Sequence, residues 1–99
     1  MTVNFQYVDV DVSETLSAFT EEKLNKLFNR YEFLINATVR FKHDEHSHAK
    51  GKICDIELSL PGPRIFSTSD ESQYEVAVRE TINDLERQLK KRKEVYKTY

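Results

Sequence analysis

The stretch that decides the fold is Cys54-Asp55-Ile56-Glu57-Leu58-Ser59-Leu60-Pro61-Gly62-Pro63. Apolar and polar residues alternate as far as Leu60, which is typical of a β-strand with one buried and one solvated face. The solvated face would carry Asp55, Glu57 and Ser59. Proline and glycine then end the strand and turn the chain. We therefore expect residues 64–68 to return alongside it as a second strand.

The residues before this stretch predict two more strands and a helix. Segments 3–7 and 35–41 each alternate apolar with polar side chains, and Ile35 begins the apolar side of the second. Between them, apolar side chains recur at helical spacing over residues 16–31. Ser13 is well placed to cap the N-terminus of that helix.

The end of the chain predicts a second helix, and with it the fold class. Its narrow apolar seam consists of Val78, Ile82, Leu85 and Leu89. The element order is then β-α-β-β-β-α, in which the last three strands pair antiparallel and the first helix returns the first strand to the same sheet. Each helix has one apolar face. The predicted class is therefore α+β: two layers, a four-stranded sheet with both helices on one face, in one domain over residues 1–99.

The composition is that of a small globular domain. Apolar residues make up 38% of the chain, and there are only two glycines and two prolines, so a disordered chain is excluded. No apolar run approaches the roughly 18–20 residues of a membrane span, and the N-terminus lacks the regions of a signal peptide. The single cysteine, Cys54, excludes an internal disulfide and fits a buried small hydrophobe. We therefore expect a cytoplasmic protein without a membrane partner.

Charge is distributed unevenly along the second helix. The whole chain has a net charge of −2. Residues 70–86 contain six acids and one base, whereas residues 87–97 contain six bases and one acid, a local excess of five positive charges. Screening limits charge effects to about 8 Å at physiological salt, so a partner would meet this basic end and not the average of the chain.

Basic residues on the two helices are candidate phosphate-binding groups. Lys23, Lys26 and Arg30 are spaced three and four apart and share one stripe of the first helix. The second helix offers Arg87, Lys90, Lys91, Arg92 and Lys93. If the helices lie side by side, these residues can form one positive surface, as phosphate binding requires. Solvated helices also end in bases that offset the macrodipole, so spacing alone leaves both interpretations open.

Other chemistry has weaker support. His43, His46 and His48 could bind a transition metal, but all three lie on one polar loop, whereas a structural metal usually joins two elements. A loop without metal is the favoured interpretation. The sequence contains no nucleophile elbow, glycine-rich phosphate loop or cysteine pair. We therefore expect no enzymatic activity, no cofactor and no small-molecule substrate.

The C-terminal helix also carries a family resemblance. The run Leu85-Glu86-Arg87-Gln88-Leu89-Lys90-Lys91-Arg92-Lys93 resembles the L-x-R-Q-L-x-K-x-K segment of the ribosome hibernation-promoting factors, also called protein Y or sigma-54 modulation proteins. Further features agree in order: V-N-F-Q at 3–6, Lys23-Leu24-x-Lys26-Leu27, Leu34-Ile35-Asn36, the 58–62 turn and Tyr74-Glu75-x-Ala77-Val78. The resemblance covers essentially the whole chain.

The resemblance implies a fold like that of a double-stranded-RNA-binding domain and a place on the small ribosomal subunit. Members bind between head and body, over the ribosomal RNA, where messenger and transfer RNA would lie. Translation is silenced by occupancy, and this short form, without a C-terminal dimerisation domain, is expected to be monomeric off the ribosome. The implied RNA contacts are Lys23, Lys26, Arg87, Lys91 and Lys93; local charge alone adds Arg30, Lys90 and Arg92.

Asp84 departs from the family pattern, because many members carry a basic residue three positions before the Arg of R-Q-L. One expected phosphate contact is therefore missing or repulsive here. The alternative function is that of a protein-binding transcription regulator of the sigma-54 modulation type. Such a regulator could use the solvated face of the sheet.

Overall fold

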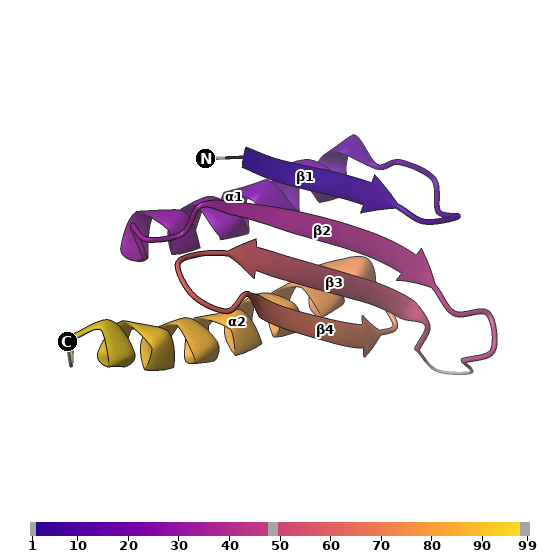
Figure 1. Cartoon of the computed structure of the whole chain (residues 1–99). Coiled ribbons are helices and arrows are strands. Elements are labelled where there is room, and N and C mark those ends of the chain that lie inside the picture. Colours follow the sequence, from indigo (N-terminus) through magenta and orange to yellow (C-terminus); the bar gives the residue numbers. More distant parts are fainter. Residues whose placement is uncertain (1, 48–49, 98–99) are drawn as a thin grey trace.

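The computed structural model describes residues 2–47 and 50–97 and has the expected element order. The elements are β1 Thr2–Tyr7, α1 Glu14–Arg30, β2 Asn36–His43, β3 Lys52–Ser59, β4 Ile65–Glu71 and α2 Tyr74–Lys97. They form two layers, with both helices covering one face of the four-stranded sheet (Figure 1). The predicted α+β class and the position of both helices on one face are confirmed.

The strands lie in the order β1-β2-β3-β4, which follows from their connections. β1 pairs parallel with β2, because α1 carries the chain back along the sheet between them. β2, β3 and β4 follow one another through short connections and pair antiparallel. The register sets Val39 opposite Ile56, and Ile56 opposite Ser67. Side chains that alternate along each strand therefore combine into one continuous inner face.

The hydrophobic core fills the space between the sheet and the helices. Phe41, Ile56 and Leu58 of the sheet have no exposed surface, and neither have Leu24 of α1 and Leu85 of α2. Burying a side chain of this size stabilises a fold by about 1.5–3 kcal/mol. Both helices are thus held to the sheet by their apolar faces, which leaves their polar faces to solvent.

Two residues differ from the simple alternation. Ile35 was expected on the buried side but is 54% exposed, and it lies in the connection before β2 and not in the strand itself. Asp55 was expected on the solvated face but is only 6% exposed. Its carboxylate lies 2.6 Å from Lys42 Nζ and accepts a hydrogen bond from the hydroxyl of Thr68, so these two neighbours cover it.

The helix ends place the basic residues. Ser13 caps α1 as expected: its side chain accepts a hydrogen bond of 3.2 Å from the Leu16 N–H. Both helices run in the same direction, so their C-terminal ends lie at the same end of the molecule (Figure 1). The basic second half of α2 is therefore beside and beyond the end of α1.

Candidate nucleic-acid interface

Side chains from both helices meet along the groove between α1 and α2. Near the ends of the helices, Arg30 Nη1 lies 2.5 Å from Glu86 Oε2. Lys93 Nζ lies 5.9 Å from the centre of the Tyr31 ring. Arg30 keeps 63% of its side chain exposed, and exposed ion pairs contribute only about 0–1 kcal/mol. The guanidinium is therefore available to a stronger anionic ligand.

Nearer the start of α2, one aromatic ring lies beside two cations. The Phe19 ring centre is 5.3 Å from Lys23 Nζ and 5.7 Å from Arg79 Cζ. Each contact of this kind contributes about 0.5–1 kcal/mol at an exposed site. Sequence reasoning missed Arg79, since it is the one base among the acids of residues 70–86. Helix packing brings it to the same ring as Lys23.

Helical spacing adds two lysines to the same groove. Lys26 lies between Lys23 and Arg30 on one stripe of α1, and Lys90 follows Glu86 by one turn of α2. We call the resulting set the inter-helix cluster: Lys23, Lys26, Arg30, Arg79, Lys90 and Lys93. It extends about 20 Å along α2, at 1.5 Å per residue. Within residues 2–47 and 50–97, neither Lys26 nor Lys90 forms an ion pair, so their charges are free for a ligand.

The remaining three candidates lie on other sides of α2. Arg87 Nη2 is 3.5 Å from Asp84 Oδ1, and Arg87 lines a groove beside β4. Lys91 follows Arg87 by one turn and shares that side. Arg92 lies over the β3–β4 turn, where its Nη1 donates a 3.2 Å hydrogen bond to the Pro61 carbonyl. The single positive surface expected from sequence is therefore divided: five candidates border the inter-helix groove and three do not.

Asp84, the departure from the family pattern, also lies on the β4 side. It accepts a 2.8 Å hydrogen bond from Gln88 Nε2, which also donates to the Phe66 carbonyl. Its pKa is lowered, chiefly by a hydrogen bond from Ser67 and further by Gln88 and Arg87. The carboxylate is thus ionised, held against β4 and paired with Arg87. It does not face the inter-helix cluster.

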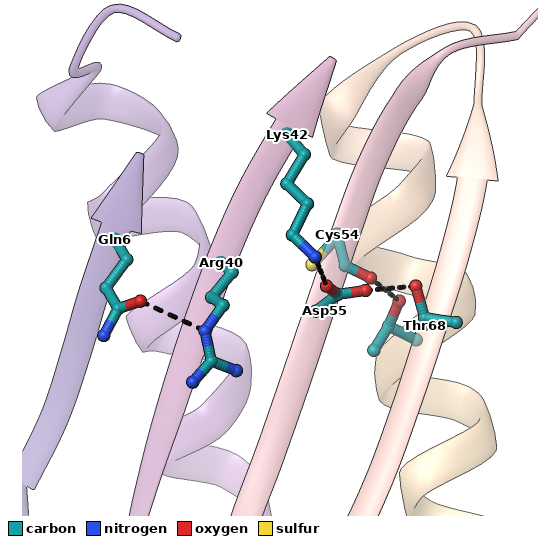
Figure 2. Close-up of polar contacts among 7 residues, drawn as sticks. Gln6, Arg40, Lys42, Cys54, Asp55 and Thr68 are labelled. Atoms are coloured by element: carbon teal, nitrogen blue, oxygen red, sulfur yellow. Dashed lines mark hydrogen bonds and ion pairs between the residues drawn. The ribbon is translucent and has the colours of Figure 1, made fainter. Parts of the chain in front are cut away.

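The open face of the sheet, opposite the helices, has its own cations, and Figure 2 shows the polar partners of two of them, Arg40 and Lys42. Lys42 contacts the buried Asp55 carboxylate, which Thr68 also contacts. The other two pairs are Arg40 Nε with Gln6 Oε1 at 3.0 Å and Arg64 with Glu57 at 3.4 Å. Lys42 and Arg64 thus have acidic partners, whereas the neutral amide of Gln6 leaves the charge of Arg40 uncompensated.

The histidines, the cysteine and the helices were also considered for a metal site, a reactive thiol and a membrane span. Over the described residues, no group of three His, Cys, Asp or Glu could hold a metal; His48 lies outside those residues. Cys54 is fully buried, and burial raises the pKa of its thiol to about 12. The thiol therefore stays protonated at neutral pH, as expected for a core residue. Of the helices in the described part of the chain, none is long and apolar enough to span a membrane.

Comparison with known proteins places this arrangement in a family. The family described as sigma 54 modulation protein / S30EA ribosomal protein matches residues 3–97. No functionally curated protein shows significant sequence similarity to the chain.

Two solved structures share the fold. A ribosomal subunit interface protein from Coxiella burnetii is 28% identical with a TM-score of 0.84, and the match covers 94% of this chain and 98% of that one. The N-terminal domain of Thermus thermophilus protein Y is 20% identical with a TM-score of 0.78, over 92% of this chain and 98% of that one. At 20% identity, the second match is a likeness of fold alone.

Proposed function

The chain belongs to the sigma 54 modulation protein / S30EA ribosomal protein family, and on that basis we propose that it is a ribosome hibernation factor. It binds ribosomal RNA of the small subunit and blocks the sites of messenger and transfer RNA. Translation is inhibited by occupancy, with no catalytic step. The protein acts in the cytoplasm and is a monomer off the ribosome.

The observation that carries this proposal is the inter-helix cluster. Lys23, Arg30, Arg79 and Lys93 make contacts where the two helices meet, and the core beneath holds both helices in place. Helical spacing puts Lys26 and Lys90 on the same sides of the helices. A fixed set of cations over about 20 Å can neutralise several phosphates and release their counterions, which drives nucleic-acid binding. Arg87, Lys91 and Arg92 extend the positive surface around α2. The subunit interface protein from Coxiella burnetii, similar over nearly the whole chain, supports the ribosome as the partner.

Recognition would depend on the shape and phosphates of folded RNA more than on base sequence. Lysine and arginine side chains on the surface of two helices suit phosphate contacts, which carry no sequence information directly. Affinity should therefore fall steeply with salt, since each phosphate contact contributes about one unit to the slope of log affinity against log salt.

The test is co-sedimentation of the purified protein with small subunits over a series of salt concentrations. We expect saturable binding that weakens with salt and is competed by messenger and transfer RNA. The double variant Lys26→Glu/Lys90→Glu should weaken binding at low salt by more than tenfold and reduce the salt slope by about two.

The control is Lys50→Glu, a single charge reversal of an exposed lysine in the β2–β3 connection, outside the inter-helix cluster; Lys50 lies 3.8 Å from Glu71. It should leave affinity within about twofold of the wild type, as expected for a residue outside the interface. If both variants bind like the wild type, the helices are not the interface. A partner that is retained after nuclease treatment would favour a protein-binding regulator instead.

A further inference from the structure

A notch of about 370 Å³ opens where both helices end, at one end of the inter-helix groove. It is lined by Arg30, Tyr31, Glu32, Phe33, Lys93 and Tyr96. These residues come from the end of α1, from the connection to β2 and from the last turns of α2. Its volume is within the range of small-ligand sites, about 300–1,000 Å³.

The walls of the notch are three aromatic rings in contact. The Phe33 ring centre lies 5.9 Å from that of Tyr31 and 4.9 Å from that of Tyr96, both in edge-to-face arrangements. Tyr31 is buried and belongs to the core, but Phe33 and Tyr96 each keep part of their surface in solvent. The Tyr96 hydroxyl donates to the Pro61 carbonyl, which fixes its ring. Phe33 packs against the core and keeps part of its ring in solvent, whereas Tyr96 lies outside the core cluster, so core packing does not explain its partly exposed ring.

Two cations, Arg30 and Lys93, lie at the rim of the notch. Lys93 lies over Tyr31, and Arg30, although paired with Glu86, is largely exposed. Exposed aromatic rings beside cations are how proteins hold single-stranded nucleic acid: bases stack on the rings and the backbone lies along the charges. Glu32 also lines the notch, and its carboxylate can accept a hydrogen bond from the amino group of adenine, guanine or cytosine.

We infer that this notch binds one unpaired nucleotide of an RNA strand, with the base against Phe33 and Tyr96 and its phosphate at Arg30 and Lys93. The inference rests on the proposed function, because the notch continues the phosphate-binding groove. It adds a contact of another kind. Stacking is independent of salt, whereas phosphate contacts are not, so the two can be measured separately.

The first experiment measures small-subunit affinity over a salt series for Phe33→Leu, which keeps an apolar side chain and removes the ring. We expect affinity to fall about tenfold at every salt concentration with an unchanged salt slope, as loss of one stacked base predicts. Phe33→Tyr, which keeps an aromatic ring, should bind with wild-type affinity. The matched control is Phe66→Leu, since Phe66 is a 51% exposed ring on the open face of the sheet.

The second experiment distinguishes an RNA strand from a free nucleotide. Binding of AMP, UMP and the RNA hexamers A6 and U6 is followed by the ring signals of Phe33 and Tyr96 in NMR spectra. We expect A6 to bind more tightly than AMP, because neighbouring phosphates reach the inter-helix cluster, and A6 to bind more tightly than U6, because uracil lacks an amino group. AMP binding as tightly as A6 would instead indicate a free-nucleotide site and overturn the RNA assignment.

These measurements separate the two ideas. If Phe33→Leu binds subunits like Phe66→Leu while wild-type affinity falls steeply with salt, the notch inference is wrong and the proposed function stands. If wild-type protein does not bind subunits at low salt, the proposed function is wrong. Binding of the hexamers then tests the notch inference by itself. Ring signals of Phe33 and Tyr96 that shift with A6 would support the inference, and unchanged ring signals would reject it.

Discussion

The two surfaces of this protein use their charges in opposite ways. On the open face of the sheet, Lys42 contacts the Asp55 carboxylate, and the two arginines there also have close polar partners. On the helix layer, cations outnumber acids along one groove, and Lys26 and Lys90 form no ion pair with other residues in ranges 2–47 and 50–97. A net charge of −2 hides this difference.

The difference shows why whole-chain charge is a poor guide to binding. The pair between Lys42 and the buried Asp55 offers a ligand little, because the ligand must first displace a buried carboxylate. An unpaired cation on the helices loses only water and counterions. The open face should therefore matter for stability and the helix layer for affinity, and the following substitutions test that division.

The largest effect is expected from detaching the helix layer. Leu85 of α2 is fully buried against the sheet, and Leu85→Ala should lower the free energy of unfolding by about 2–5 kcal/mol. A domain of this size has about 5–15 kcal/mol in total, so the variant retains little stability. Urea denaturation followed by circular dichroism measures the change. A loss below about 1 kcal/mol would mean that α2 is not held by this seam.

A smaller loss of stability is expected on the open face. Asp55→Ala removes the common partner of Lys42 and Thr68 and should cost about 1–2 kcal/mol, as for a hydrogen-bonded charge. Subunit affinity and its salt slope should stay unchanged when measured on the folded protein. If affinity fell as much as in a helix variant, the open face would belong to the interface.

One charge reversal on each surface compares the helix layer with the open face directly. Lys91→Glu on α2 should change stability by less than about 0.5 kcal/mol, since the side chain is exposed. It should weaken subunit binding about tenfold at low salt and reduce the salt slope by about one. Arg40→Glu on the open face is the matched change and should leave binding intact. Equal losses in both variants would point to a general effect of net charge.

The smallest effect concerns pH. The pKa of Asp84 is lowered in the folded protein, so its contribution to stability is complete above its ordinary pKa of 3.8 and is lost as pH falls through the folded value. Asp84→Asn should therefore lower the melting temperature slightly at pH 7, and the difference from wild type should shrink below pH 3.8. Glu45→Gln in the β2–β3 connection is the control. A pH-independent difference would contradict the ionised hydrogen-bonded carboxylate.

Much of the fold follows from local patterns that the sequence displays directly. The alternation in Cys54–Leu60 predicts a strand with one dry face, and Leu85 and Leu89 mark the seam of α2, because side chains repeat every two residues in a strand and every 3.6 in a helix. The exceptions are residues whose exposure depends on neighbours from elsewhere. Asp55 is buried by Lys42 and Thr68, which lie on two other strands.

The candidate interface also combines local features that the sequence shows with features that depend on tertiary packing. The basic stripe of α1 and the basic end of α2 are local features, and their spacing along each helix is enough to identify them. How α2 is rotated against α1 and the sheet is not local, since it depends on packing between elements distant in sequence. That rotation places Arg79 near the Phe19 ring, turns Arg87 toward β4 and brings Tyr96 against Phe33. Sequence periodicity specifies the face of each element, whereas tertiary packing selects which faces meet.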